Sequence, residues 1–278
     1  WYTATPYADT AYIASEDKIY ANQDASYLFS NIGNSDDCTK TEVITNIELL
    51  NVNNVTNMSY MFSYFGFRKM ISLDLRENFD TSNVTNMSHM FNVCGLQAMT
   101  SLKLGSKFNT YNVTNMSYMF NSCGVGKIEE LDLGSDFNTS NVTNMSYMFN
   151  NFGGDSKSLE TLNLGDKFNT INVTNMAGMF IECGRVGMTS LDLGDYFYTN
   201  KATNMNSMFA SCGNQALTSL DLGPAFTKIA DINNNFVTNC GKNGEIVIHA
   251  PESIYQDINN FKLNTNSTTT INFTRGTI

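Results

Sequence analysis

Residues 112–120 read Asn-Val-Thr-Asn-Met-Ser-Tyr-Met-Phe, and close variants of this stretch recur along the chain. Its valine lies at Val55, Val84, Val113, Val142 and Val173, and Ala202 takes the same place in the next copy. Successive copies are 29 residues apart, except for the 31 residues between Val142 and Val173. A period of this length is typical of stacked supersecondary units, none of which buries its apolar face alone. The sequence therefore predicts one elongated solenoid.

Each repeat has two halves with different apolar spacing. In the first half Leu102 and Leu104 alternate with polar residues, which predicts a short strand with both leucines on one face. In the second half Val113, Met116 and Phe120 are spaced like the apolar stripe of a short helix. Parallel strands stack about 4.8 Å apart and helices pack roughly 8–10 Å apart, so we expect a curved stack. The expected fold is an α/β solenoid, a horseshoe with short parallel strands on its concave face and short helices on its convex face.

The regular apolar positions predict the core. All 15 methionines fit inward positions of this template. The phenylalanine between the two halves is expected to fill the gap where the chain reverses direction, and its copies are Phe79, Phe108, Phe137, Phe168, Phe197 and Phe226.

Five of the six cysteines share one position of the repeat. Buried free cysteine packs as a small hydrophobe, and we favour unpaired thiols. Rungs about 4.8 Å apart also lie within the Cα range of a disulfide, so Cys94–Cys123 and Cys212–Cys240 bridges stay an alternative.

Three regions are expected along the chain. Residues 1–42 are aromatic and irregular and suit an N-terminal cap or lead-in. Residues 43–249 hold the array, with about seven to eight units at a period of about 29 residues. Residues 250–278 suit a C-terminal cap or the start of a following region, with a helix over Ile254–Phe261 and a weakly alternating strand near Thr268–Phe273.

Composition and motifs favour a protein that is not an enzyme. The net charge of −10 disfavours nucleic acid and anionic membranes as partners, and no apolar window is long enough for membrane insertion. The only histidines, His89 and His249, lie near opposite ends of the array. No nucleotide-binding or metalloprotease motif occurs, so we expect no cofactor and no metal centre. A carboxylate pair for glycoside hydrolysis stays open, although nothing singles one out.

The repeat from Leu73-Asp74-Leu75 to Cys94 resembles the leucine-rich-repeat surface proteins of the BspA type, whose Met-Phe-x-x-Cys ending is similar to that of treponeme-type leucine-rich repeats. The resemblance covers about residues 43–241. It implies a leucine-rich-repeat horseshoe and a secreted or cell-surface bacterial protein, commonly an adhesin that binds a protein or glycoprotein ligand on host cells, matrix or neighbouring cells. This chain departs from the pattern through longer repeats, with extra residues such as 153–157, and through Phe65 and Phe152 in place of the cysteine.

Two sets of residues are candidate contacts. Tyr60, His89, Tyr118 and Tyr147 occupy the helical position opposite the apolar stripe, which predicts an aromatic row on the convex surface. The row is either an interaction strip or a set of rings lying flat over the edge of the core, and the sequence favours neither.

Asp192 and Asp221 place like charges on neighbouring strands. Shared binding of Ca²⁺ is one reading of this pair, and two solvated carboxylates is the favoured one.

Two functions follow from these features. The first is a binding module that acts in adhesion outside the cell. The second is a structural spacer or a building block of an extracellular assembly, with self-association through the open ends of the array.

Overall fold

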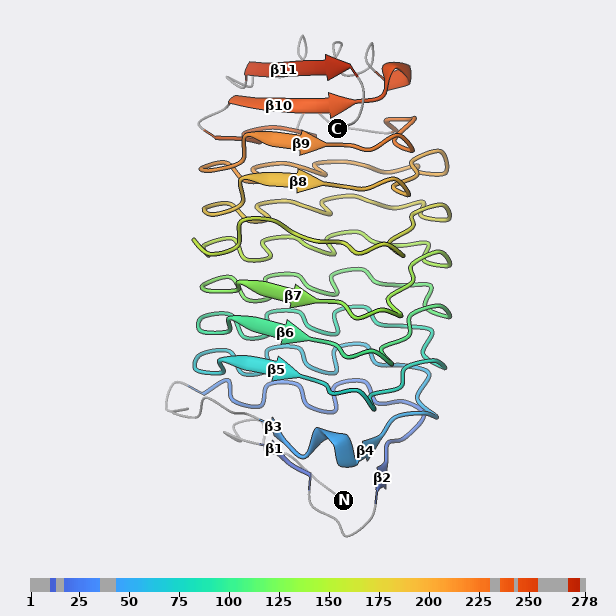
Figure 1. Cartoon of the computed structure of the whole chain (residues 1–278). Helices are drawn as coiled ribbons and strands as arrows, with labels where there is room; N and C mark the ends of the chain where they lie inside the picture. The colour runs from blue at the N-terminus through green and yellow to red at the C-terminus, as the bar shows by residue number, and fades with distance from the viewer. Residues whose placement is uncertain are drawn as a thin grey trace.

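The computed structural model describes residues 11–13, 18–35, 44–230, 236–242, 245–254 and 270–275. The chain winds into a solenoid in which each repeat forms one turn, here called a rung (Figure 1). The strands are β1 (Ala11–Tyr12), β2 (Ile19–Tyr20), β3 (Ile44–Thr45), β4 (Leu50–Asn51), β5 (Ser72–Asp74), β6 (Ser101–Lys103), β7 (Glu130–Asp132), β8 (Ser190–Asp192), β9 (Ser219–Asp221), β10 (Glu245–Ala250) and β11 (Thr270–Arg275). Two 3₁₀ helices, η1 (Ile47–Leu49) and η2 (Glu252–Ile254), complete the described elements.

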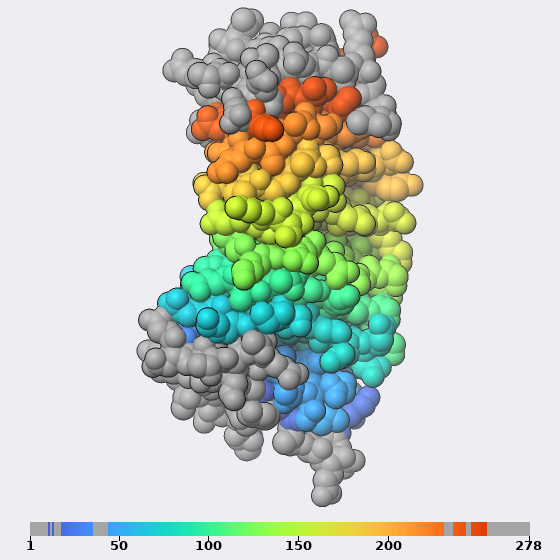
Figure 2. All heavy atoms as spheres, turned by 60° about the vertical axis from the view of Figure 1, so that its left-hand side comes forward, coloured from blue at the N-terminus to red at the C-terminus, as the bar shows by residue number. Residues whose placement is uncertain are grey.

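The strands pair in parallel from rung to rung, as predicted. β5, β6 and β7 form one sheet, and β8, β9, β10 and β11 form another. Leu102 lies opposite Leu73 on one side and Leu131 on the other, so the leucines stack in register. In the space-filling view the rungs follow one another in sequence order along the long axis of the molecule (Figure 2).

The short helices expected in the second half of the repeat are wrong, because no α-helix occurs in the described residues. The chain from Met116 onward is a run of tight turns, in which the Met119 amide donates to the Met116 carbonyl at 3.2 Å. Other amides of the same segment donate to carbonyls of the next rung. The Met116 amide donates to Asn144 O at 3.0 Å, and the Tyr118 amide donates to Ser146 O at 2.9 Å.

The spacing of the rungs explains why turns replace helices. An α-helix would satisfy its amides internally and would hold neighbouring rungs roughly 8–10 Å apart, whereas paired strands hold them about 4.8 Å apart. Turns let the second half match the strands, and left-handed residues such as Tyr118 (φ 58°) and Gly124 (φ 58°) bend the chain at each one. With turns in place of helices the stack runs straight (Figure 1), so the horseshoe curvature is not seen.

The predicted core is confirmed. All 15 methionines and the inward phenylalanines are buried. One phenylalanine per rung stacks face to face on the next, with ring centroids 5.5 Å apart for Phe91–Phe120 and 5.4 Å apart for Phe120–Phe149. A second column begins with Phe79 and Phe108, whose centroids lie 6.4 Å apart. Because each rung repeats the same contacts, the core is continuous along the stack.

The asparagines of the motif tie the rungs together. Asn86 Nδ2 donates to Asn57 Oδ1 at 3.2 Å, and the same Oδ1 accepts the Ser59 amide at 3.1 Å. The same asparagines also form parallel backbone β-bridges from rung to rung, which continue through Asn115, Asn144, Asn175 and Asn204. The polar part of the motif therefore satisfies backbone groups and holds the register between rungs.

Both ends of the described chain continue the stack. Asp24 bridges to Asn57, and the Ala25 amide donates to Asn57 O at 3.0 Å, so part of the expected N-terminal segment is itself a rung. β11 pairs with β10, which confirms a strand near Thr268–Phe273. The helix expected over Ile254–Phe261 lies outside the described residues, apart from Ile254. Within the part of the chain that is described, no helix is long and apolar enough to cross a membrane.

Candidate binding surfaces

The structure brings the predicted aromatic residues together in one stacked row, here called the aromatic ladder. Ring centroids are 4.3 Å apart for Tyr60–His89, 4.5 Å apart for His89–Tyr118 and 4.7 Å apart for Tyr118–Tyr147. The angles between neighbouring planes are 7°, 6° and 14°. Tyr27 extends the row by one further ring, 4.7 Å from Tyr60.

Stacking leaves the edges of these rings, rather than their faces, at the surface. The four predicted side chains are half-buried, and Tyr27 at the N-terminal end is 56% exposed. At the other end a Cβ at Gly178 would lie 2.4 Å from the Tyr147 ring, so the chain at Gly178 covers the last face. The ladder thus covers its own faces and presents a strip of ring edges at the spacing of the rungs.

Sequence reasoning missed Tyr27, although a signal was there. Ser26-Tyr27-Leu28-Phe29 repeats the pattern of Ser59-Tyr60-Met61-Phe62, with 33 residues between the two tyrosines. The longer interval and the missing valine motif hid this copy.

Partial burial shifts the pKa of three ladder residues toward the uncharged form. Desolvation lowers the pKa of the His89 imidazole. Desolvation raises the pKa of the Tyr60 phenol, and the neighbouring Tyr27 adds to the rise. The pKa of Tyr118 rises for the same reason, with smaller contributions from Tyr147 and Tyr60. These pKa shifts favour the uncharged forms of Tyr60, His89 and Tyr118.

The strand wall has an opening between β7 and β8, where the sequence predicted another strand at Leu162 and Leu164. Residues 161–165 form no strand, and the two sheets end on either side of them (Figure 1). Elsewhere a leucine amide bonds to the next rung, as Leu193 does to Asp221 O at 3.0 Å. The equivalent bonds from Leu133 to Asn163 and from Leu164 to Asp192 are missing from this described stretch.

The glycine that follows each strand shows the same opening, because a Cβ added there would touch the preceding rung only where the two rungs are close together. A Cβ at Gly134 would lie 2.3 Å from Gly105 O, and one at Gly223 would lie 2.2 Å from Gly194 O. A Cβ at Gly165 or at Gly194 would meet nothing within 4 Å. The rung of Gly165 is therefore separated from both of its neighbours on this wall.

The opening contains a cleft of about 750 Å³. Its lining includes four carboxylates and no basic side chain; the acidic residues are Asp166, Asp192, Asp195 and Asp221. Leu162, Leu164 and Leu193 form part of the same lining at the level of the core. Ligand sites are commonly clefts of roughly 300–1,000 Å³, so the cleft has the size of a binding site.

Asp192 and Asp221 lie on paired strands, as the sequence placed them. Each carboxylate accepts the amide two residues further on: Gly194 N–H reaches Asp192 Oδ1 at 2.8 Å, and Gly223 N–H reaches Asp221 Oδ1 at 2.9 Å. Asp221 is only 5% exposed, whereas Asp192 is exposed. In the part of the chain that the structure describes, no three acidic, histidine or cysteine side chains gather as metal ligands would.

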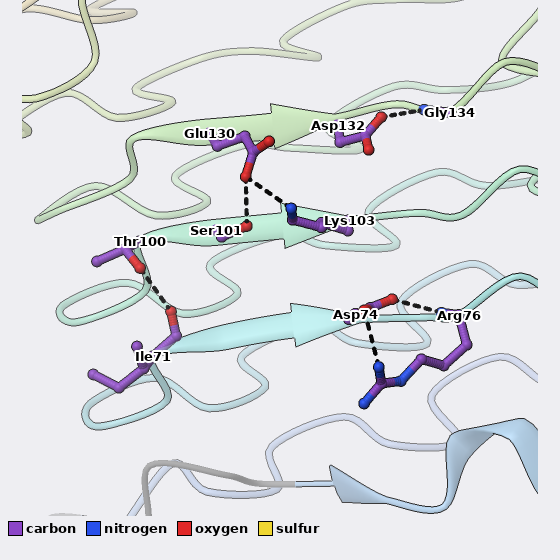
Figure 3. A network of polar contacts seen from close by, with 9 residues as sticks. All are labelled: Ile71, Asp74, Arg76, Thr100, Ser101, Lys103, Glu130, Asp132 and Gly134. Atoms are coloured by element: carbon purple, nitrogen blue, oxygen red, sulfur yellow. Dashed lines mark hydrogen bonds and ion pairs between the residues drawn. The ribbon is translucent and has the colours of Figure 1, made fainter.

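Two carboxylates of the intact strand wall form ion pairs, whereas Asp132 on β7 has none among the described side chains. Lys103 pairs with Glu130 at 3.2 Å across neighbouring strands, and Arg76 pairs with Asp74 at 3.3 Å within one rung (Figure 3). Asp166, Asp192 and Asp195 have no such ion pair among the described side chains. The opening therefore gathers three exposed carboxylates that no described ion pair neutralises.

Five cysteines lie in the core as free thiols, and the sixth, Cys38, lies outside the described residues. Burial, followed by a hydrogen bond with Cys94, raises the pKa of Cys123 well above its usual range. A hydrogen bond with Cys240, followed by burial, does the same to the pKa of Cys212. These groups are neutral packing residues near pH 7 and poor nucleophiles.

The fold and the repeated surface define a β-solenoid repeat protein. Four overlapping matches, to residues 27–130, 63–166, 96–222 and 151–275, place the chain in a family, and it belongs to the one described as "Mycoplasma protein of unknown function, DUF285". No curated protein matches the chain. No solved structure matches it either.

Proposed function

We propose that this protein is a non-enzymatic binding module of the cell surface, which acts in adhesion to a protein or glycoprotein ligand. The observation that carries the proposal is the aromatic ladder, a row of five stacked rings at the spacing of the rungs. Tyrosine is enriched in protein interfaces because it buries a large area and keeps a polar group at its edge. The likeness of the repeat to BspA-type leucine-rich-repeat surface proteins supports the extracellular location and belongs to the same proposal.

The ladder is tested by replacing Tyr60, Tyr118 and Tyr147 together with Ser. Binding to matrix-coated surfaces and to cells is measured for the whole chain, and circular dichroism checks the fold. Loss of binding by a folded variant is the expected result. The matched control replaces Tyr20 and Tyr111, which are 68% and 54% exposed and lie outside both the ladder and the cleft. Unchanged binding after the ladder is removed would sink this role.

The straight stack favours a second candidate, a spacer that holds another domain away from a surface (Figure 1). A spacer binds nothing as an isolated fragment. If it assembles end to end, it forms filaments that negative-stain microscopy reveals, because open strand edges pair readily.

A further inference from the structure

We propose that the opening between β7 and β8 is a docking site for an extended peptide segment of a partner protein, with basic and apolar residues in alternation. The segment would lie between residues 161–165 and β8 and pair with both as an added strand. This site lies on the strand wall, separate from the aromatic ladder, and does not depend on the ladder's role.

Backbone groups on both sides of the opening lack the partners that the rest of the wall provides. In the closed part, Leu75 N–H donates to Lys103 O at 2.9 Å and Leu193 N–H donates to Asp221 O at 3.0 Å. The corresponding bond from Leu164 N–H to Asp192 O is not formed in this described stretch. Unpaired strand edges are templates for another strand, because each backbone group gains a hydrogen bond on pairing.

The length of the opening sets the length of the segment. At one end Thr189 N–H still bonds to Glu160 O at 2.9 Å, and at the other Thr170 N–H bonds to Tyr196 O at 3.1 Å. Between these two bonds, the continuous stretch that lines the cleft is residues 161–166. At about 3.3 Å per residue, this stretch spans about 20 Å and accommodates roughly six residues of extended chain.

The lining sets the chemistry of the segment. Side chains of a strand alternate between the two faces of its sheet. On the inner face an added strand would meet buried Leu162, Leu164 and Leu193. On the outer face it would meet the exposed carboxylates of Asp192 and Asp195, which have no ion pair among the described side chains. Complementarity therefore calls for small apolar residues alternating with Lys or Arg.

The test titrates the whole chain with the peptide acetyl-Lys-Val-Lys-Val-Lys-Val-Lys-amide by calorimetry at 0.15 M salt. Two matched peptides accompany it, one with Glu for each Lys and one with alternate amides N-methylated, which keeps the charge and removes hydrogen-bond donors. We expect each change to weaken binding at least about tenfold, because ion pairing and several backbone bonds are lost. Amide hydrogen exchange should slow at Leu162, Leu164 and Asp192 when the first peptide is bound, whereas the Leu193 amide already bonds to Asp221 O.

The protein variants follow the same logic. Asp192→Asn with Asp195→Asn removes two charges, while an asparagine at 192 keeps the oxygen that accepts the Gly194 amide. Asp74→Asn is the matched control, because Asp74 accepts the Arg76 amide in the same way within the closed wall. We expect the double variant to lose about fivefold or more in affinity and the control to change by less than about twofold. Any of three results would overturn the proposal. The N-methylated peptide could bind as tightly as the first peptide, Asp74→Asn could weaken binding as much as the double variant, or the first peptide could fail to bind.

Discussion

The opening in the strand wall can be tested by adding one methyl group at a time. Gly134 and Gly165 occupy the same place in neighbouring repeats, with φ angles of 75° and 78°. Replacing either with Ala imposes the left-handed cost of an L-residue, about 1–2 kcal/mol. Only at Gly134 does the new Cβ also meet a neighbouring carbonyl, Gly105 O at 2.3 Å.

The extra cost at Gly134 follows from the contact distance. Carbon and oxygen approach to about 3.3 Å without strain, so the two rungs would have to separate by about 1 Å. That movement breaks the bond from Leu104 N–H to Asp132 O, now 3.0 Å long, and leaves both groups unpaired. Together with the strain this adds about 2–4 kcal/mol.

Thermal and urea unfolding of the two variants measure the difference. We expect Gly134→Ala to lower the melting temperature by roughly 4–16 °C more than Gly165→Ala, at about 2–4 °C per kcal/mol for a chain of this size. Gly194→Ala should behave like Gly165→Ala, since its Cβ also meets nothing within 4 Å. Equal destabilisation at Gly134 and Gly165 would refute the opening and, with it, the space for a docked strand.

Three further outcomes are expected. Phe120→Ala should destabilise the fold by about 3–5 kcal/mol in urea unfolding, because Phe120 is fully buried and stacks on both Phe91 and Phe149; a loss below about 1 kcal/mol would contradict the continuous phenylalanine column. The pKa of His89 is lower in the folded protein than its unfolded value near 6.5. Its contribution to stability is therefore present above pH 6.5 and is lost as the pH falls through the folded pKa. Wild-type melting temperature should therefore fall between pH 7 and 5 more steeply than that of His89→Tyr, and an NMR pKa above 6.5 would reverse the sign. Iodoacetamide should leave the five described cysteines unmodified in the folded protein and modify all of them after denaturation without reductant; thiols that stay unreactive after denaturation would indicate disulfides.

The sequence was sufficient for the parts of the fold that repeat. Leu102 and Leu104 mark a strand by alternation, and the methionines and phenylalanines mark the core by exclusive use of inward positions. Such patterns are reliable because every rung needs the same residues inside. The aromatic ladder was also within reach, since Tyr60, His89, Tyr118 and Tyr147 share one position of the repeat.

The helices were wrong because two structures share one apolar spacing. Val113, Met116 and Phe120 face inward on a helix and equally on a run of turns with left-handed residues. Local sequence does not distinguish the two structures. The turns require Tyr118 to adopt a left-handed conformation, with φ 58°, and a bulky residue adopts that conformation only in special contexts. The hydrogen bonds to neighbouring rungs decide it, and they exist only once the rungs are stacked.

The sequence by itself therefore determined a repeating solenoid, its buried residues and its short parallel strands, because periodic burial is written into periodic residues. It also located the irregular repeat, through the 31-residue step to Val173 and the extra residues 153–157. Only the tertiary structure decided that the stack is straight, and that the irregular repeat opens the strand wall at residues 161–165. The reason is physical: the distance between rungs is a compromise among all the groups that cross it, and no single repeat contains that information.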